Sequence, residues 1–358
     1  MKISKIELKN FRNIENLEFE PSEKTNIIYG LNAQGKTNII EAIWMFSGMK
    51  SFRGAHDKEL IKFGSEEARL RLDYLGGGMN NTAEMKIKEK RSLTLNGVEL
   101  KSPAEMTEES NIVVFSPDYL SIIKDGPSFR RGFLNNAISG VYKTYREQLK
   151  KYNRALQQRN SILKDLKYNS FLLEIIEDYE NVLSAYGERI ISTRKKYVQR
   201  LMEFMPEIYR GLTGNKEEIN CLYTTENMVE GSREELAELL RKNRQEDITC
   251  GTTSVGPHRD DLAFLINGID GRSFGSQGQQ RSVVLALKLA EAELMAEISG
   301  EKPVALLDDV MSELDPYRQD YILNHLKDWQ VFITCCDPSA LERLEGGKTV
   351  EISAGKIK

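Results

Sequence analysis

Polar and apolar residues alternate at both ends of this chain, and the pattern predicts strands on either side of a central helical region. Residues 2–8 and Ile14–Phe19 alternate with period two and predict paired strands joined at 11–13. Thr25–Tyr29 is a short apolar strand that leads into a glycine-containing loop, and 36–47 has the apolar spacing of a helix. The N-terminal part therefore predicts a strand, a loop and a helix in direct succession.

Alternation returns between 68 and 100, where three strand-like runs are broken by Gly76-Gly77-Gly78 and by Asn96-Gly97. Because Asn-Gly between alternating runs is a hairpin signal, this part predicts an antiparallel sheet beside the core. Residues 111–115 predict one more core strand.

The middle of the chain has a different composition. Residues 129–205 carry Leu, Lys, Glu, Gln, Arg and Tyr at helical spacing without a proline, which predicts two or three long helices packed as an antiparallel arm. A further helix is expected at 233–244, with a loop at 211–218.

Strand-like runs then recur towards the C-terminus. We expect strands at 252–255 and 262–266, an amphipathic helix at 282–298, central parallel strands at 304–307 and 331–334, and an edge strand at 349–352. The predicted class is α/β: a mixed sheet with an antiparallel β subdomain, built from residues 1–118 and 250–358, with a mainly helical arm inserted at 119–249.

Composition narrows the location of the protein but not its chemistry. The 358 residues are 40% hydrophobic and 29% charged, as in ordinary globular proteins. No run of eighteen or more apolar residues and no signal peptide is visible, so we expect a cytoplasmic protein without a membrane partner. Four cysteines without metal-ligand spacing are expected to be reduced, and three scattered histidines suggest no metal cluster.

Charge is unevenly distributed along the chain. The net charge is −4, yet 141–205 holds 13 Lys/Arg and 8 Asp/Glu, a local balance of +5 that leaves −9 for the rest. This basic segment is either a footprint for a polyanion or a solvated helix face, and charge alone does not separate the two readings.

The most specific motif is Gly30-Leu31-Asn32-Ala33-Gln34-Gly35-Lys36-Thr37, a full match to the P-loop pattern. Its two outer glycines allow the tight turn that points backbone amides at a phosphate, and the following helix adds the positive end of its dipole. Lys36 is expected to contact the β- and γ-phosphates of ATP and to assist catalysis, Thr37 to hold Mg²⁺, and Asn38 to complete the nucleotide-binding stretch.

A second set of motifs stands 239 residues (276 − 37) after Thr37. Asp308 follows an apolar strand and is expected to hold Mg²⁺ opposite Thr37, while Asp309 stands where a general base or water-orienting acid is needed. The alternative interpretation of these two aspartates is structural, as an acidic cap at the end of a strand. Ser276-Gln277-Gly278-Gln279 opens a helix and is read either as an anion-binding helix start or as a structural turn.

Together, these motifs resemble an ABC-type ATPase head. More narrowly, the chain resembles the RecF family of bacterial recombination and gap-repair proteins, which are relatives of the SMC proteins. The resemblance runs from end to end and is carried by the P-loop and by the stretches Leu8-Lys9-Asn10-Phe11-Arg12-Asn13, Phe115-Ser116-Pro117-Asp118, Gly256-Pro257-His258-Arg259-Asp260-Asp261-Leu262, Ser276-Gln277-Gly278-Gln279-Gln280-Arg281 and Leu307-Asp308-Asp309-Val310-Met311-Ser312-Glu313-Leu314-Asp315.

The resemblance implies a mechanism based on an ATP-dependent homodimer. The P-loop of one head faces the signature of the other, so Ser276, Gly278 and Gln279 would contact the γ-phosphate of the partner's nucleotide, and Arg12 and Asn13 would lie near the chain's own nucleotide. It also implies binding of double-stranded and gapped DNA, and cooperation with RecO and RecR in loading RecA.

Two departures from typical ABC heads predict weak, slow Mg²⁺-dependent ATP hydrolysis. Asp309 replaces the usual glutamate, and Cys335-Cys336-Asp337 stands where a switch histidine is expected. The Gly-Pro-His-Arg stretch is read as a phosphate or DNA contact, as a means of communication between head and arm, or as a structural turn. The alternative function is the nucleotide-binding subunit of an ATP-driven transporter, which the helical insertion and the Gly-Pro-His-Arg stretch disfavour.

Overall fold

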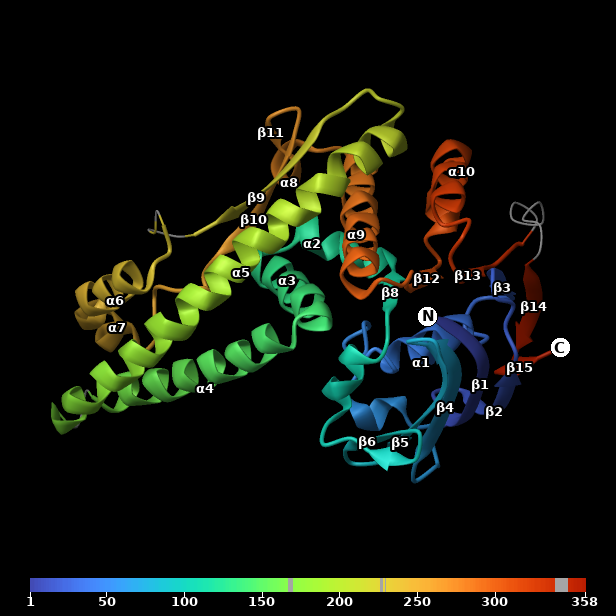
Figure 1. Ribbon diagram of the computed structural model, residues 1–358, viewed down its shortest axis with the longest axis horizontal. Helices are drawn as coiled ribbons and strands as arrows, with labels where there is room; N and C mark the ends of the chain where they lie inside the picture. The colour runs from blue at the N-terminus through green and yellow to red at the C-terminus, as the bar shows by residue number, and fades with distance from the viewer. Residues whose placement is uncertain (167–169, 226–227, 229, 339–346) are drawn as a thin grey trace. The chain divides into compact units, whose positions relative to one another are not determined.

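A computed structural model describes residues 1–166, 170–225, 228, 230–338 and 347–358. The chain divides into two compact units (Figure 1). The first unit contains Met1–Leu120, Glu207–Lys216 and Val284–Lys358, and the second contains Ser121–Pro206 and Glu217–Val283. These units are defined by compactness, whereas the expected head (1–118 and 250–358) and arm (119–249) were defined by an insertion in the sequence. The head and arm boundaries therefore stay a prediction.

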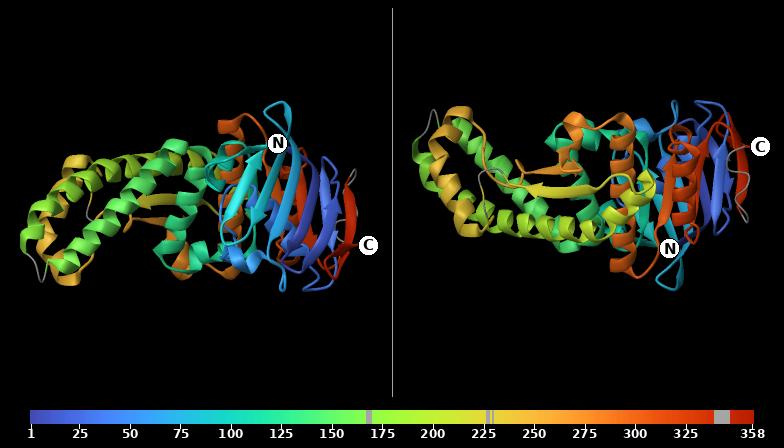
Figure 2. Two further views of the ribbon diagram at one scale, coloured as in Figure 1. Left: turned by 90° about the horizontal axis from the view of Figure 1, so that it is seen from below. Right: turned by 90° about the horizontal axis from the view of Figure 1, so that it is seen from above.

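The first unit contains a mixed sheet in which N-terminal strand β3 is inserted between strands from the C-terminal part of the chain. Its order is β15-β14-β3-β13-β12-β8, and every pair except β14–β15 is parallel. Strands coloured blue and red therefore lie side by side (Figure 2). The strands are β3 (Thr25–Tyr29), β8 (Ile112–Phe115), β12 (Val304–Asp308), β13 (Val331–Cys335), β14 (Lys348–Ser353) and β15 (Lys356–Ile357).

Most of these strands confirm the sequence-based expectations, and β3 matches its predicted range residue for residue. The strand expected at 349–352 is not at the edge, because β14 pairs with β3 on one side and with β15 on the other.

The second sheet of this unit is antiparallel, in the order β2-β1-β4-β5-β6-β7. Gly77 and Gly78 have φ of 59° and 74° at the β4–β5 turn, and Asn96 and Gly97 have φ of 52° and 80° at the β6–β7 turn, as the predicted hairpins require. The strands are β1 (Lys2–Phe11), β2 (Ile14–Phe19), β4 (Ala68–Gly76), β5 (Met79–Ile87), β6 (Arg91–Leu95) and β7 (Val98–Glu99).

Helix α1 (Lys36–Met45) lies between the two sheets, as Figure 1 shows, and is buried over most of its length. Ile39, Ile40 and Ile43 of α1 belong to one hydrophobic core with Ile6 of β1 and Leu306 of β12. This packing fixes the start of α1, and with it the P-loop, against the mixed sheet. The other helices that lie wholly in this unit are η1 (Asp57–Leu60), η2 (Pro103–Glu108), η3 (Pro117–Leu120), η5 (Met311–Glu313) and α10 (Pro316–His325).

The second unit is mainly helical, with one small antiparallel sheet in the order β11-β10-β9. The unit boundaries fall within α5 (Leu173–Thr213) and α9 (Gln277–Ser299). Its remaining elements are α2 (Ser121–Lys124), α3 (Pro127–Val141), α4 (Lys143–Asp165), η4 (Ser170–Leu172), β9 (Ile219–Thr224), α6 (Arg233–Lys242), α7 (Arg244–Cys250), β10 (Asp261–Ile266), β11 (Ile269–Asp270) and α8 (Gly271–Phe274).

The prediction of a strand at 252–255 is wrong. Side chains, rather than a neighbouring strand, bind this segment: Thr253 N donates to Asn160 Oδ1 at 2.8 Å, and Ser254 N donates to Asp247 Oδ1 at 2.9 Å. Polar residues that alternate with apolar ones can thus hold a loop in place through hydrogen bonds. The alternating segment 219–224 forms strand β9 instead, which the sequence reading had missed.

Three arginines are buried among the described residues of the second unit, and two of them, Arg159 and Arg194, lie at the centre of hydrogen-bond networks. Arg159 is fully buried and binds Glu180, Asp247 and Thr253 at 2.7–2.9 Å. Arg194 is 2% exposed and donates to Tyr145 Oη at 2.9 Å and Pro257 O at 2.6 Å. Arg194 therefore belongs to the interior and is not part of the basic surface expected from the sequence.

The Gly-Pro-His-Arg turn belongs to the same interior. His258 hydrogen-bonds to Tyr152 Oη (2.7 Å) and Thr253 O (3.0 Å), and Arg259 also donates to Thr253 O. Burial lowers the pKa of His258 to about 4, so this side chain is neutral at physiological pH. These contacts favour the structural reading of the turn over a DNA contact.

Candidate nucleotide-binding site

The P-loop connects the end of β3 to the first turn of α1, and its backbone has conformations that glycine allows. Gly30 and Gly35 have φ of 151° and 112°. A Cβ atom on Gly30 would lie 2.3 Å from Ile352 O, and one on Gly35 would lie 2.8 Å from Asn13 Oδ1. Both glycines are therefore required by close neighbours as well as by the turn itself.

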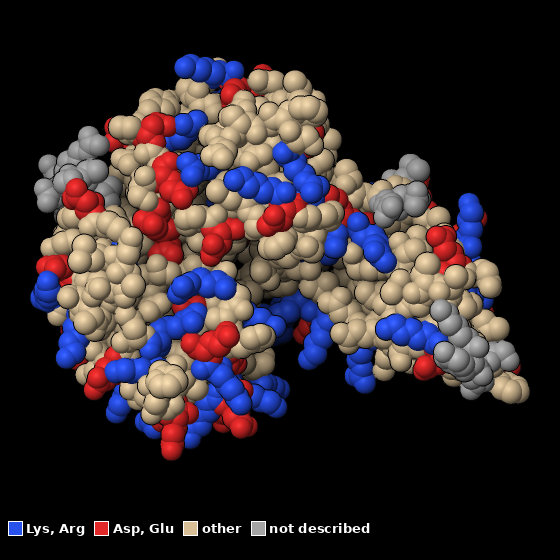
Figure 3. Space-filling model, turned by 180° about the vertical axis from the view of Figure 1, so that it is seen from behind, with Lys and Arg blue, Asp and Glu red and all other residues tan. Residues whose placement is uncertain are grey.

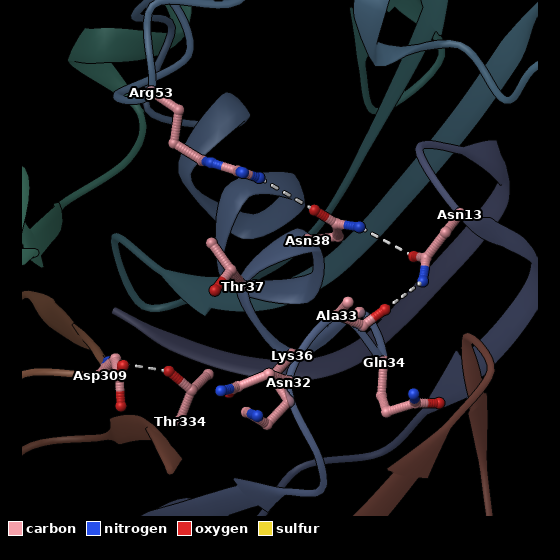
Figure 4. Close-up of a pocket in the computed structure, with 11 residues that line it drawn as sticks. Asn13, Asn32, Ala33, Gln34, Lys36, Thr37, Asn38, Arg53, Asp309 and Thr334 are labelled. Carbon is pink, nitrogen blue, oxygen red and sulfur yellow. Dashed lines mark hydrogen bonds between the residues drawn. The ribbon is translucent and has the colours of Figure 1, made fainter. Parts of the chain in front are cut away.

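A cavity of about 330 Å³ lies over this loop (Figure 4). Its lining confirms that distant parts of the sequence meet here, because β1–β2, the P-loop, the segment after α1 and the ends of β12 and β13 all contribute. The lining residues are Asn13, Asn32, Ala33, Gln34, Gly35, Lys36, Thr37, Asn38, Arg53, Asp309 and Thr334.

Lys36 is 7% exposed and is held by the loop that precedes it. Its Nζ donates to Gly30 O at 2.6 Å and to Leu31 O at 3.0 Å. Cys336 Sγ lies 3.7 Å from the same Nζ and donates to Asn32 Oδ1 at 3.1 Å. A thiol thus packs against the P-loop, near the place where the sequence comparison with ABC heads expected a histidine.

Thr37 and Asp308 face each other, as expected for two ligands of one metal ion. Thr37 Oγ1 donates to Asp308 Oδ1 at 2.9 Å, and Thr334 Oγ1 donates to the same oxygen at 2.8 Å. Burial raises the pKa of Asp308, although the two hydroxyls oppose this shift. A carboxylate and a hydroxyl at the carboxyl ends of parallel strands are a donor set that fits Mg²⁺.

Asp309 lines the cavity with a backbone φ of 53°, a left-handed conformation that Asp adopts more readily than most residues. Its amide donates to Thr334 Oγ1 at 2.9 Å, and its Oδ1 accepts from Ser312 Oγ at 2.9 Å. These bonds fix the carboxylate at the rim of the cavity, where it can meet a water molecule.

Three further side chains form a chain of hydrogen bonds along the opposite wall (Figure 4). Asn13 Nδ2 donates to Ala33 O at 3.4 Å, Asn38 Nδ2 donates to Asn13 Oδ1 at 2.8 Å, and Arg53 Nη1 donates to Asn38 Oδ1 at 3.2 Å. Sequence reasoning missed Arg53, because it follows α1 in an irregular segment that matches no motif.

Arg12 is not among the residues that line the cavity. Its guanidinium binds both oxygens of the fully buried Glu41, at 2.9 Å and 2.8 Å, and so links the β1–β2 turn to α1. Gly30, Leu31 and Asp308 do not line the cavity either, but they hold residues that do.

Ser276, Gly278 and Gln279 belong to the second unit, whereas every residue that lines the cavity belongs to the first. Ser276 and Gln279 form a reciprocal cap at the start of α9: Gln279 N donates to Ser276 Oγ at 3.2 Å, and Ser276 N donates to Gln279 Oε1 at 2.8 Å. Gly278 is exposed, and a Cβ atom built on it would meet nothing within 4 Å. No contact within the described part of this chain therefore explains why position 278 is a glycine.

Comparisons with known proteins place the chain in a broad class of proteins with an SMC-type N-terminal domain. The model of the RecF/RecN/SMC N-terminal domain matches residues 2–357. The solved Smc head domain from Pyrococcus furiosus shares the fold, with a TM-score of 0.58 at 16% identity over 100% of this chain and 95% of that one.

More similar proteins narrow the class. The DNA replication and repair protein RecF of Lachnospira eligens is 42% identical over 94% of this chain and 92% of its own length, and that of Clostridium acetobutylicum is 44% identical over 96% and 95%. The solved recombination mediator protein RecF-ATPrS of the RecFOR pathway superposes with a TM-score of 0.92 at 39% identity, covering 99% of this chain and 97% of that one. The chain belongs to the RecF family of DNA replication and repair proteins.

No helix within the described ranges has both the length and the apolar character needed to cross a membrane.

Proposed function

We propose that this protein is an ATP-dependent DNA-binding protein of recombinational gap repair, whose ATP-bound dimer engages duplex DNA beside single-stranded gaps. The observation that carries the proposal is the pairing of Thr37 with Asp308, at 2.9 Å, beside a cavity lined by P-loop residues. Support also comes from the relatives, since one solved RecF is described with ATP and another with ATPrS.

ATP binding is assigned to the P-loop. The amides between Gly30 and Thr37 would surround the β-phosphate, and Lys36 would exchange its bonds to the Gly30 and Leu31 carbonyls for bonds to phosphate oxygens. Thr37 and Asp308 would hold Mg²⁺, which when bound offsets the negative charge of the phosphates. Asn13 and Arg53 reach the cavity from the other side and add an amide and a positive charge.

Hydrolysis requires a water molecule in line with the γ-phosphate. Asp309 would accept a hydrogen bond from this water and orient it for attack on phosphorus, as the bond to the β-phosphate oxygen breaks to give ADP and phosphate. The Asp309 carboxylate accepts a hydrogen bond from Ser312 Oγ, and it is one methylene shorter than the usual glutamate. With Cys336 rather than histidine near Lys36, we expect slow turnover that times the release of DNA.

Dimerisation is assigned to the start of α9. Ser276 and Gly278 are exposed, and an exposed glycine with no steric need of its own suits the close approach of a second molecule. The γ-phosphate held by one copy would then meet the α9 amides of the other, so that ATP stabilises the dimer by linkage. RecO and RecR are the proposed partners in loading RecA.

Sedimentation of the purified protein with and without ATP tests the dimer. The wild type is expected to dimerise with ATP and to remain monomeric without it. Lys36→Arg should weaken nucleotide binding and dimerisation together, whereas Ser276→Arg should block dimerisation while each monomer still binds ATP. A wild type that stays monomeric with saturating ATP and DNA would overturn the mechanism.

A further inference from the structure

The second unit presents a row of basic side chains on α4. This helix contains seven Lys/Arg and two Asp/Glu, a strong imbalance for one helix. Lys150, Lys151 and Arg154 are exposed, as is Arg189 of α5. Among the described residues, none of these four side chains forms an ion pair with a carboxylate.

Basic residues on the antiparallel sheet of the first unit behave differently. Lys5 pairs with Glu7 and Glu18 at 2.7 Å and 2.6 Å, and Glu67 accepts from Lys86 and Lys88 at 3.1 Å and 3.0 Å. Positive and negative side chains are accordingly mixed over this unit, on the left in Figure 3. The pairing there neutralises the surface, whereas on α4 the positive charge stays available to a ligand.

The basic side chains of α4 share their surface with hydrogen-bond donors. Positions 150, 154, 157, 158 and 161 recur at intervals that place them along one side of a helix, and Gln157, Gln158 and Ser161 are exposed there. Eleven residues separate Lys150 from Ser161, a rise of about 16 Å. That length is comparable with the width of a DNA major groove of about 12 Å plus its flanking phosphates.

Helix α5 runs in the opposite direction beside α4 (Figure 1) and extends this surface. The Tyr186 ring lies 5.6 Å from Lys151 Nζ and 5.7 Å from Arg189 Cζ. Both cations are thus held next to each other by one aromatic ring, and their ordering lowers the entropy cost of a further contact. Glu147 is the exposed carboxylate nearest along α4, and it leaves the surface with a clear positive excess.

We propose that this surface, defined as Lys150, Lys151 and Arg154 of α4 with Tyr186 and Arg189 of α5, binds the sugar–phosphate backbone of duplex DNA. The inference rests on the proposed function and assigns the DNA contact within it. Lysine and arginine neutralise phosphates, while amide and hydroxyl groups donate hydrogen bonds to phosphate oxygens without regard to sequence. The contact therefore supplies affinity and salt dependence but no sequence preference.

Binding of a fluorescent 30-base-pair duplex in the presence of ATP tests the surface. Lys150→Gln/Lys151→Gln/Arg154→Gln is compared with Lys62→Gln/Lys86→Gln/Lys88→Gln, which removes three positive charges from the first unit. Loss of three phosphate contacts should lower the slope of log affinity against log salt by about 2.7 and weaken binding on the order of 10²-fold near physiological salt. The control should keep the wild-type slope.

Two further measurements separate the possible outcomes. A charge-preserving variant, Lys150→Arg/Lys151→Arg/Arg154→Lys, should keep the wild-type slope, and ATP-dependent dimerisation of all variants should be unchanged. If the α4 variant and the control have equal slopes of log affinity against log salt, the assignment of this surface is wrong, but the proposed function is not affected. If the wild type binds no DNA in the presence of ATP, the proposed function is wrong as well. If the α4 variant binds DNA like the wild type but loses binding to polyglutamate, the surface binds an acidic protein partner, and the assignment to DNA is wrong.

Discussion

The nucleotide cavity and the buried network of the second unit both contain charged residues, yet they differ in how deeply those charges are buried. In the cavity, the Arg53 side chain is 42% exposed and lies 3.7 Å from Glu41, and within the described residues the Asp309 carboxylate accepts from Ser312 alone. In the buried network, Arg159 binds two carboxylates and a hydroxyl with no exposed surface. Partly exposed charges at a cavity remain available to a ligand, whereas fully buried ion pairs form part of the scaffold.

The largest expected effect is a difference in stability between substitutions in these two regions. Arg159→Met leaves Asp247 buried without its cation and Glu180 with Arg244 alone, so the free energy of unfolding should fall by about 3–5 kcal/mol. Arg53→Met removes a partly exposed charge whose buried partner Glu41 keeps Arg12, so it should change the free energy of unfolding by less than about 1 kcal/mol. Urea denaturation of both variants measures the difference, and equal losses would break the comparison.

Asp309→Asn should affect chemistry rather than folding. The amide keeps the size of the side chain but orients water poorly, so we expect hydrolysis to slow by about 10²–10³-fold, comparable with loss of one catalytic hydrogen bond. ATP affinity and the melting temperature should stay near those of the wild type. Single-turnover hydrolysis gives the rate, and an unchanged rate would remove Asp309 from the mechanism.

Opposite pKa shifts predict a compensated pH dependence in the buried network. Burial raises the pKa of Asp260 from 3.8 to about 6, so its stabilising contribution is present below pH 3.8 and is lost as pH rises towards 6. Burial lowers the pKa of His258 from 6.5 to about 4, so its contribution is present above pH 6.5 and is lost as pH falls towards 4. The two contributions oppose each other between pH 4 and 6.

Asp260→Asn should therefore make stability rise with pH more steeply than in the wild type, by about 2 kcal/mol between pH 4 and 6. His258→Asn should shift the slope in the other direction. Urea denaturation at several pH values measures both slopes, and a common slope in all three proteins would contradict the assigned shifts.

The smallest effect is expected at Cys336. Cys336→Ser keeps a hydrogen-bond donor for Asn32, so ATP affinity should change by less than about threefold, or about 0.7 kcal/mol. Alkylation of the exposed Cys336 thiol should instead block ATP binding, because the added group would lie beside Lys36. The serine variant serves as the control, since the exposed Cys250 remains available in both proteins. ATP binding by wild type after full alkylation would disprove the effect.

Local patterns in the sequence were sufficient to predict the elements that carry the site. The P-loop was predicted because its chemistry requires fixed residue types at fixed spacing, and β3 because its apolar run is bounded by polar residues. The pairing of Thr37 with Asp308 was predicted from the same motifs, but the contribution of Thr334 to this pair was not. It depends on β13 lying between β3 and β12, and sequence order does not reveal the order of parallel strands in a sheet.

Failures occurred where side chains replaced regular structure. Residues 252–255 alternate like a strand, but the side chains of Asn160 and Asp247 bind their backbone amides, and Asn160 lies 93 residues before its partner. Arg194 was expected on the basic surface because charged residues are seldom buried, and only the structure reveals the tyrosines and the carbonyl that compensate it.

The position of β3 has a consequence for synthesis on the ribosome. Both strands that pair with β3 lie near the C-terminus, and the amides of Ala354 and Gly355 donate to Gln34 at 2.6 Å and 2.9 Å. A nascent polypeptide elongated only as far as residue 330 would carry every P-loop residue but lack each of these neighbours. Translation that stops early should thus yield products unable to hold nucleotide, rather than deregulated fragments that compete with the complete protein.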